Sequence, residues 1–374
     1  MAIALILAAI VWTALQLERR LPTFRALGAA LVGILLGMLL SNTGLLPGTS
    51  PTYGWLSSTG VSLAVALILL NVDVASLRSA GPRMLGAFTI GAVATAVGAL
   101  LGFVVVGRTV GPEAWKLAGQ FAGTYTGGGM NFAALGRALD TSSDLFTAAV
   151  AADVALTAVW MAACLTAPLL LGRSPIGADA IGVASDDGEP GVDKALTNSL
   201  RPLAIADLAA LVTLAIGALW LAGRLAEWVP VLPEVLWLST IALLLAQIPA
   251  IRTLTGGALL GNYLLLLFLA ANGAQSVIAN IFRVGPAVFW FAAITIAVHG
   301  IGIFGVGKLF GIDAGTLAVA SQANVGGPAS AVALAGARGY TDRVLPGVAV
   351  GLLGYAVGNY SGFLIANVAR AWLG

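Results

Sequence analysis

Apolar residues run through almost the whole chain in long stretches, separated by only a few polar residues each. A helix that crosses a bilayer needs about 20 predominantly apolar residues. Twelve stretches approach that description: 1–17, 27–41, 57–72, 84–107, 113–140, 144–171, 200–222, 234–250, 258–279, 286–308, 311–338 and 342–370. The pattern predicts an all-α polytopic membrane protein.

The composition supports this class. Hydrophobic residues make up 59% of the chain and charged residues 9%, with a mean hydropathy of +0.98. A soluble domain carries about 25% charged residues. The basic residues are scattered over short loops, so no nucleic-acid partner is expected. Arg19 and Arg20 follow the first apolar stretch instead of preceding it, which predicts a retained first helix and not a cleaved signal peptide.

One long polar break divides the chain into two halves. It predicts an N-terminal repeat at 1–171, a polar linker at 172–199 and a C-terminal repeat at 200–374. Residues 107–150 match 307–350 at 12 of 44 positions when the offset is 200. Shared composition alone would give roughly 4–5 matches, so we infer an internal duplication.

A glycine-rich segment occurs at the same place in each half, at Gly123–Asn131 and at Ser321–Ser330. Glycine, proline and small polar residues break helices. In a membrane such a break is tolerated where protein or a water-filled cavity covers the freed backbone groups. Paired breaks in matching positions of two halves are typical of the central site of a secondary transporter.

The number of crossings bears on the form of these segments. Inverted repeats need an odd number of crossings per half. Each half has six apolar stretches. If the glycine-rich stretch of each half is a re-entrant hairpin, five crossings remain in each half and ten in the whole chain. That topology places 12 basic residues on the inside and 6 on the outside, against 10 and 8 for full crossings. The positive-inside rule therefore favours hairpins, with a broken crossing helix as the alternative.

Small polar residues flank the glycines of both segments. At a helix break, free carbonyls can coordinate a cation and free N–H groups attract an anion. The alternative is that these residues only pack helices or cap their ends. We predict that they bind a solute or ion, together with backbone that glycine leaves accessible. The predicted set is Thr124, Thr126, Gly127, Gly128, Gly129, Asn131, Ser321, Gln322, Asn324, Gly326, Gly327 and Ser330.

Three acids lie in or beside apolar stretches, where an unpaired carboxylate is costly and usually marks an ion path. Asp153 directly follows the first hairpin, and we predict it as the titrating or cation-binding group. Asp207 and Asp73 are weaker candidates. The one histidine, His299, is expected to be a hydrogen-bonded core residue, with a proton relay as the alternative. No metal site is predicted beyond a cation at Asp153.

The chain lacks the motifs of hydrolases, zinc proteases and ATP-driven pumps. We therefore predict no enzyme activity but an ion-coupled secondary transporter of a small anionic or polar solute. The alternatives are an intramembrane enzyme using Asp153 and His299, or a non-transporting membrane regulator. Segments 84–107 and 286–308, both hairpins and the spans after them are expected to form a mobile unit. The remaining segments would form a scaffold.

At several of these residues the chain resembles a membrane-protein family of bacteria and plastids, the domain-of-unknown-function family numbered 819. The resemblance covers nearly the whole length. It rests on Leu17–Arg20, Ser41–Asn42, Gly81–Arg83, Gly111–Gly119, Thr124–Phe132, Ala151–Asp153 and Ala323–Ala329. It implies a multi-pass protein of the bacterial inner membrane.

More distantly, the paired glycine motifs are similar to those at the hairpin tips of sodium-coupled glutamate and citrate symporters. That resemblance implies two inverted repeats and an elevator-like transport domain. It implies that the backbone of Gly127, Gly128, Gly326 and Gly327 lines the site. Na⁺ as the coupling ion is likewise an implication of this resemblance, and H⁺ remains open. We expect a homodimer formed through the scaffold.

Overall fold

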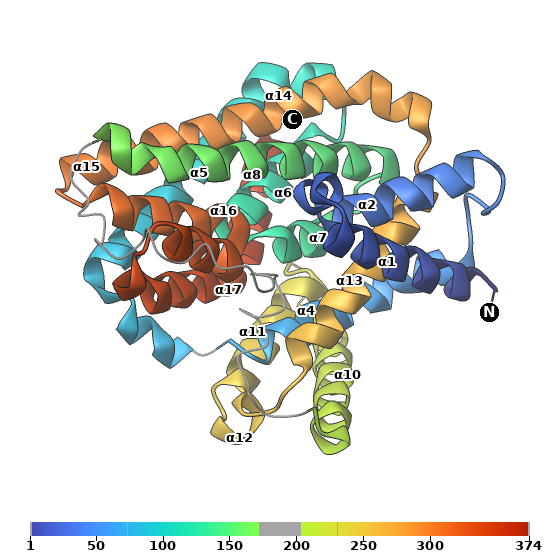
Figure 1. Cartoon of the computed structure of the whole chain (residues 1–374). Coiled ribbons are helices and arrows are strands. Elements are labelled where there is room, and N and C mark those ends of the chain that lie inside the picture. Colours follow the sequence, from blue (N-terminus) through green and yellow to red (C-terminus); the bar gives the residue numbers. More distant parts are fainter. Residues whose placement is uncertain (1, 73, 172–202, 230, 373–374) are drawn as a thin grey trace.

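The computed structural model describes residues 2–72, 74–171, 203–229 and 231–372 of this protein, and its regular elements are all helical (Figure 1). The predicted all-α class is therefore confirmed for the described chain. The linker at 172–199 and Asp73 lie outside the described residues. The first half contains α1 (Ala2–Arg20), α2 (Pro22–Asn42), α3 (Pro51–Trp55), the π-helical turn η1 (Leu56–Gly60), α4 (Val61–Leu69), the 3-10 segment η2 (Val74–Ser79), α5 (Gly81–Val110), α6 (Ala114–Gly127), α7 (Gly129–Ala138) and α8 (Ser143–Leu171).

The second half has a similar order of elements. It contains α10 (Ile205–Trp228), α11 (Glu234–Ala246), α12 (Pro249–Arg252), α13 (Gly257–Ala274), α14 (Ile278–Gly300), the π-helical η3 (Ile301–Val306), α15 (Gly307–Leu309), α16 (Ala314–Ala337) and α17 (Thr341–Ala371).

Eight helices of the described chain are long and apolar enough to cross a bilayer. Two more apolar helices, Gly28–Asn42 within α2 and the 13-residue α11, are shorter. At 1.5 Å per residue, α11 spans about 20 Å of a hydrocarbon core about 30 Å thick. These ten helices coincide with the ten predicted crossings, and the chain is a multi-pass membrane protein.

Both glycine-rich segments are broken at a single glycine. Gly128 has φ 80° and ψ 177°, and Gly327 has φ 76° and ψ −166°. Glycine adopts a positive φ without the steric cost that a Cβ imposes. Beyond the first break the chain turns back, because Gly119 faces Leu139 and Gly123 faces Leu135 across the two arms. Residue numbers that rise along one arm and fall along the other indicate antiparallel packing.

The ends of each broken segment lie together, as a hairpin requires. The Glu113 carboxylate accepts a hydrogen bond of 3.0 Å from the backbone N–H of Ser142. At the second segment, Asp313 and Arg343 form an ion pair of 3.2 Å. A straight helix of the 24 residues of α16 would hold its two ends about 36 Å apart. We call α6 with α7 the first hairpin and α16 the second hairpin.

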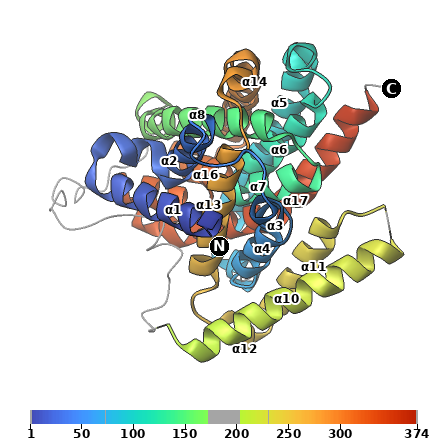
Figure 2. The same ribbon diagram turned by 90° about the vertical axis from the view of Figure 1, so that its right-hand side faces the viewer.

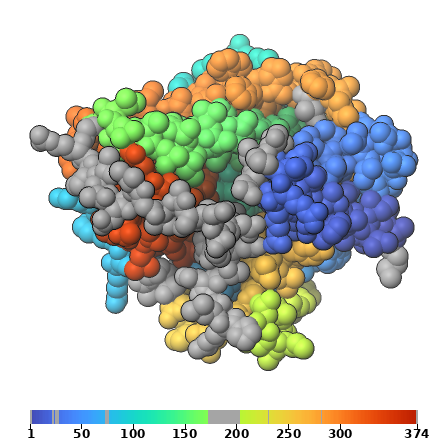
Figure 3. Space-filling model, viewed as in Figure 1, coloured from blue at the N-terminus to red at the C-terminus, as the bar shows by residue number. Residues whose placement is uncertain are grey.

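The helices form two groups that pack mainly within themselves. The core unit comprises both hairpins, α5, α8, α14 and α17. The scaffold unit comprises α1, α2, α4, α10, α11 and α13. In the two ribbon views α10, α11 and α12 lie at one edge of the molecule and α14 at the opposite edge (Figures 1 and 2). Helix α8 lies at the surface of the core unit, where the space-filling view shows it (Figure 3).

Glycines let the first hairpin approach α17 very closely. Gly119 and Gly123 face the backbone carbonyls of Gly362 and Gly358, and Gly127 faces that of Gly354. Each of these pairs sums to the same number, so the two helices run antiparallel in one continuous register. Small residues at such spacing allow backbone contact between helices in membranes. The first hairpin is therefore packed against α17 from Gly119 to Gly127 of α6.

The corresponding helices α5 and α14 also pack antiparallel. A Cβ on Gly98 would lie 2.6 Å from the carbonyl oxygen of Thr295, and one on Gly102 would lie 2.9 Å from the ring of Phe291. Polar contacts also join α8 at both of its ends to other helices or loops of the second half. Asp144 accepts a hydrogen bond of 2.6 Å from the N–H of Val277 at one end of α8. Lys308 donates one of 3.1 Å to the Leu171 carbonyl at the other end.

Candidate functional site at the hairpin tips

The tips of the two hairpins touch inside the core unit. A Cβ placed on Gly128 would lie 3.5 Å from backbone atoms of both Gly326 and Gly327. The ring of Tyr355, from α17, lies against both breaks, at 3.6 Å from such an atom on Gly128 and 3.1 Å from one on Gly327. The structure thus brings together two glycine segments that are 199 residues apart in the sequence.

Buried polar atoms without partners gather beside these tips. Five residues supply them, and each of the five is 0% exposed. Leaving such a group unpaired costs about 1–3 kcal/mol, so a native cluster of them calls for a bound partner such as water or a ligand. Of the buried atoms without a hydrogen-bond partner in the described chain, those in the two glycine-rich segments are Thr124 Oγ1, the Tyr125 hydroxyl, Asn131 Oδ1, and both amide atoms of Gln322 and of Asn324.

Asn131 and Ser330 occupy equivalent places in the two hairpins. Each is the third residue after its break and packs across the hairpin on the glycine before the break, Gly127 or Gly326. The Asn131 amide also donates to the Gly354 carbonyl at 3.3 Å. The structural offset of 199 is one less than the sequence offset of 200, because the second hairpin breaks one residue earlier.

The tip of the first hairpin has an opening. Gly129 is exposed, and a Cβ on it would meet no atom within 4 Å. In the second hairpin, Gly326 and Ser330 are partly exposed. The first N–H groups of α7 begin at this opening, and such groups have no partner inside their own helix. Thr126, the remaining predicted residue of this tip, is buried.

Ser321 is placed differently from the other predicted residues. Its hydroxyl lies 2.9 Å from His299 Nε2 and accepts a hydrogen bond of 2.9 Å from Trp160 Nε1. The Ser321 hydroxyl therefore already has hydrogen-bond partners within the protein. His299 is buried and hydrogen-bonded, as expected for a core histidine.

Asp153 lies on α8 and is partly exposed. Thr157, one turn along the helix, donates to its carboxylate at 3.5 Å. The Tyr125 hydroxyl lies close to the same carboxylate but lacks the geometry of a hydrogen bond. Asp153 is thus connected to the first hairpin through Tyr125. In the part of the chain that the structure describes, no three His, Cys, Asp or Glu side chains come together as metal ligands.

Asp207 has a structural explanation. It lies in the first turn of α10, at the end of the span instead of inside it. Its carboxylate accepts hydrogen bonds of 3.1 and 3.0 Å from the backbone N–H and the hydroxyl of Thr255. These bonds hold the loop before α13.

An acid closes the open end of each hairpin. Glu113 also accepts from Lys116 at 2.9 Å, and Asp313 accepts from the Thr316 N–H at 2.9 Å. Burial alone would raise the pKa of both carboxyls. The hydrogen bonds, with the charge of Lys116 at Glu113 and that of Arg343 at Asp313, more than offset burial and lower each pKa below its ordinary value. The two acids are 200 residues apart, which is the offset at which the sequence predicts a duplication.

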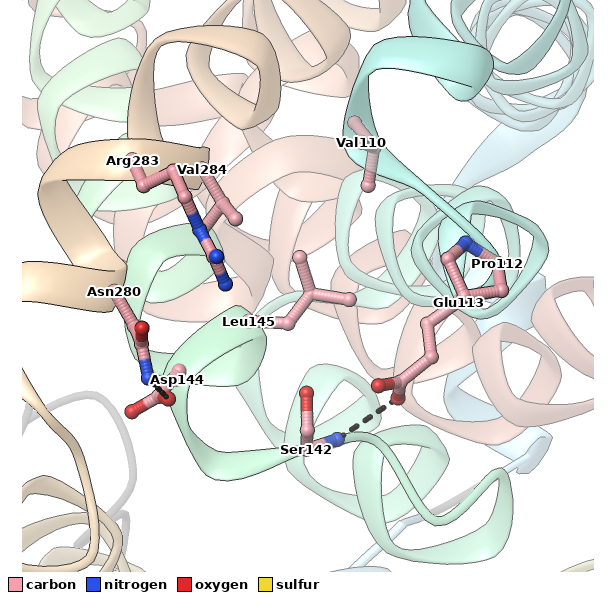
Figure 4. Close-up of a pocket in the computed structure, with 9 residues that line it drawn as sticks. All are labelled: Val110, Pro112, Glu113, Ser142, Asp144, Leu145, Asn280, Arg283 and Val284. Carbon is pink, nitrogen blue, oxygen red and sulfur yellow. Dashed lines mark hydrogen bonds between the residues drawn. The ribbon is translucent and has the colours of Figure 1, made fainter.

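A pocket with a volume of about 170 Å³ lies at the open end of the first hairpin (Figure 4). Asp144 accepts a hydrogen bond of 2.6 Å from Asn280 there, and the Arg283 side chain extends toward Leu145 (Figure 4). The carboxylates of Glu113 and Asp144 already have partners. The pocket opens at the surface, and none of its lining residues belongs to the tips. Its lining residues are Val110, Pro112, Glu113, Ser142, Asp144, Leu145, Asn280, Arg283 and Val284.

The family assignment rests on almost the whole chain. The model of a family described as "Protein of unknown function (DUF819)" matches residues 1–372. The chain belongs to the DUF819 family. The "Uncharacterized membrane protein YjcL" of Bacillus subtilis (strain 168) is 28% identical over 387 residues, covering 97% of this chain and 96% of the relative. The resemblance inferred from the motifs is thereby confirmed, whereas the more distant similarity to glutamate and citrate symporters stays an expectation.

Several residues of this candidate site were not predicted from the sequence. Tyr125 stands inside the glycine-rich segment, so its place between Thr124 and Thr126 could have drawn attention to it. Tyr355 lies in the apolar stretch 342–370 and is not among the predicted site residues. Thr95 and Trp160, which surround His299, lie in ordinary apolar stretches, and no pattern in the sequence marks them.

Proposed function

We propose that this protein is an ion-coupled secondary transporter of a small polar or anionic solute, working by alternating access. One observation carries the proposal: the tips of two broken helices meet inside the core unit, beside a cluster of buried amides and hydroxyls without partners. Discontinuous helices that offer free backbone and polar side chains at mid-membrane are how many secondary transporters bind solutes.

The arrangement of the halves supports inverted repeats. Each half has five apolar helices and one hairpin, in the same order. The corresponding helices α5 and α14 run antiparallel, which is the relation that inversion requires. Each hairpin would then enter the membrane from its own side, and the two tips would meet near the midplane.

The division into two units supports a mechanism of relative motion. The core unit carries both hairpins and contacts the scaffold unit at few places. Those contacts include specific polar pairs that relative motion would break: Arg137 with Glu234 at 3.2 Å, Thr240 with Tyr360 at 2.7 Å, and Asn272 with Thr147 at 2.8 Å. In the proposed cycle the core unit moves against the scaffold, which also forms the homodimer contact.

Asp153 is the proposed coupling residue. A carboxylate in a span is expensive unless a proton or cation neutralises it. The nearby Tyr125 hydroxyl and Thr157 provide oxygens for either ion, and both Na⁺ and H⁺ fit the proposal. An ion bound at Asp153 would influence the first hairpin through Tyr125.

The enzyme alternative receives less support. Both ring nitrogens of His299 face neutral protein groups, and its observed hydrogen bonds do not include Asp153. A catalytic histidine needs a free nitrogen within reach of a substrate. The regulator alternative gives no reason for a cluster of unsatisfied polar groups at the tips.

Reconstitution into proteoliposomes tests the proposal. Uptake of small solutes is screened under an imposed Na⁺ or H⁺ gradient, with Asn324→Ala as the site variant and Asn367→Ala as its control. Asn367 is exposed on α17 and bonds only to its own helix, at the Phe363 carbonyl. We expect flux in the wild type and the control, and its loss in Asn324→Ala. Absence of flux for every solute, together with a chemical product, would refute the transporter proposal.

A further inference from the structure

A chain of hydrogen bonds connects the two hairpins through the core unit. Trp160 of α8 donates to Ser321 of the second hairpin at 2.9 Å. Ser321 lies 2.9 Å from Nε2 of His299 in α14, and Nδ1 of that ring lies 2.9 Å from Oγ1 of Thr95 in α5. Thr95 donates to the backbone carbonyl of Tyr125 in the first hairpin at 3.0 Å. Five helices are thus joined by four consecutive bonds.

The partners determine the tautomer of His299. Nδ1 lies 3.0 Å from the carbonyl oxygen of Gly91, which can only accept, so Nδ1 carries a proton. The groups that bond to or stack on the ring in the described chain are this carbonyl, the hydroxyls of Thr95 and Ser321, and the indole of Trp160, and none is charged. The ring is therefore neutral, and Nε2 is an acceptor. Ser321 must donate to it.

All four bonds then point in one direction. The Trp160 N–H donates to Ser321 and the Ser321 O–H to His299. The His299 Nδ1–H is shared between Thr95 and the Gly91 carbonyl, and the Thr95 O–H donates to the Tyr125 carbonyl. Chains of this kind are cooperative, because each bond polarises the next. The last acceptor lies in the final turn of α6, where carbonyls have no partner inside the helix. Thr95 satisfies one of them.

We infer that His299 is a positioning residue that couples the two hairpins. It holds Ser321 of the second hairpin and, through Thr95, the last turn of the first. Displacing the second hairpin removes the donor from Nε2 and weakens the bonds that follow. The hydroxyl of Ser321 is consumed in this role, which leaves Gln322 and Asn324 to contact a solute. This role rests on the proposed function only in treating the tips as the binding site.

The first test uses the fact that the chain has one histidine. Protein labelled with ¹⁵N-histidine gives a single imidazole in nanodiscs. We expect a protonated Nδ1 and a hydrogen-bonded, unprotonated Nε2. Ser321→Ala should move the Nε2 resonance toward that of a free acceptor and leave Nδ1 protonated. The control Thr166→Ala, an exposed α8 hydroxyl bonded only to its own helix, should change neither resonance. A protonated Nε2 in the wild type, or an Nε2 resonance that Ser321→Ala leaves in place, would overturn the inference.

The second test asks whether each hairpin responds to a change in the other. Thr95→Val removes the hydroxyl at nearly constant volume, and Thr95→Ser keeps it. Hydrogen exchange at residues 318–326 should become about fivefold faster in Thr95→Val, the effect of losing one net hydrogen bond, and stay unchanged in Thr95→Ser. Ser321→Ala should accelerate exchange at 121–129 similarly. Effects confined to the element that carries the substitution would refute coupling. Neither test needs a solute, so its outcome is independent of the transport assay.

Discussion

The glycine contact between α6 and α17 leads to a quantitative prediction. A Cβ at Gly119 would lie 2.7 Å from the carbonyl oxygen of Gly362 and 2.7 Å from the Cβ of Ala366. Neither atom belongs to the flexible end of a side chain, so Gly119→Ala must push the two helices apart. Overpacking of this kind costs about 1–3 kcal/mol. Alanine also favours a helix over glycine by about 1 kcal/mol, which acts in the opposite direction.

A matched control removes the propensity term. Gly217 lies within α10, is exposed, and would meet no atom within 4 Å with a Cβ added. Gly217→Ala therefore gains the helix propensity without the overpacking. The two variants should differ by about 1–3 kcal/mol, with Gly119→Ala the less stable. At about 1.3 °C per kcal/mol for a chain of 374 residues, their Tm values should differ by about 1–4 °C.

Scanning fluorimetry of both variants in the same detergent measures this difference, and size-exclusion profiles check that both are folded. Gly119 lies about two turns from the tip, so the change tests packing of the hairpin and not ligand binding. A Tm for Gly119→Ala equal to or above that of Gly217→Ala would show that α6 and α17 do not pack backbone to backbone.

Three further predictions follow from the hairpins and from Asp153. The lowered pKa of Glu113 means that its stabilising contribution is complete above the ordinary value of 4.5 and is lost as pH falls through the lower folded value. Glu113→Gln should therefore lower Tm relative to wild type at pH 7, and the gap should close as the buffer is taken well below pH 4.5; a gap that persists unchanged in acid would contradict this. Cysteines at Val110 and Ser142 should react with an impermeant thiol reagent from the same side of the membrane, and one at Phe310 from the other, whereas opposite sidedness for 110 and 142 would mean a crossing helix. Asp153→Asn should abolish the ion dependence of transport while leaving membrane insertion intact, and unchanged dependence on Na⁺ and pH would make Asp153 structural.

The crossing helices and the hairpins could be predicted because each depends on a local or global pattern. The length of the apolar stretches predicts the membrane spans. The odd number of crossings that inverted repeats require and the distribution of basic residues both favour a glycine-rich segment that returns to the side where it started. The structure adds the contact of Glu113 with Ser142 that joins the ends of the first hairpin. The place of each break was less predictable. Any of several consecutive glycines can adopt a positive φ, and packing against Tyr355 distinguishes Gly128 and Gly327 from their neighbours.

The site itself was predictable in composition but not in its connections. The glycine segments mark Asn131, Gln322 and Asn324, whose unpartnered atoms now lie beside the tips. Nothing in a single sequence indicates that Ser321 meets a histidine from α14 and a tryptophan from α8, because those contacts depend on how helices far apart in the chain cross. For the same reason Asp207 could be taken for a residue inside a span, although the helix begins only at Ile205.

The two hairpins differ in side chain at one structurally equivalent position. At the structural offset of 199, Gly123 of the first hairpin corresponds to Gln322 of the second. Gly123 has no side chain, and its place is filled by the Gly358 carbonyl of α17 and by Leu135 of the opposite arm. Gln322 directs an amide toward Gly326, with both polar atoms unpartnered in the described chain. In the first hairpin this position thus packs against the neighbouring helix, and in the second it leaves hydrogen-bonding capacity beside the tip.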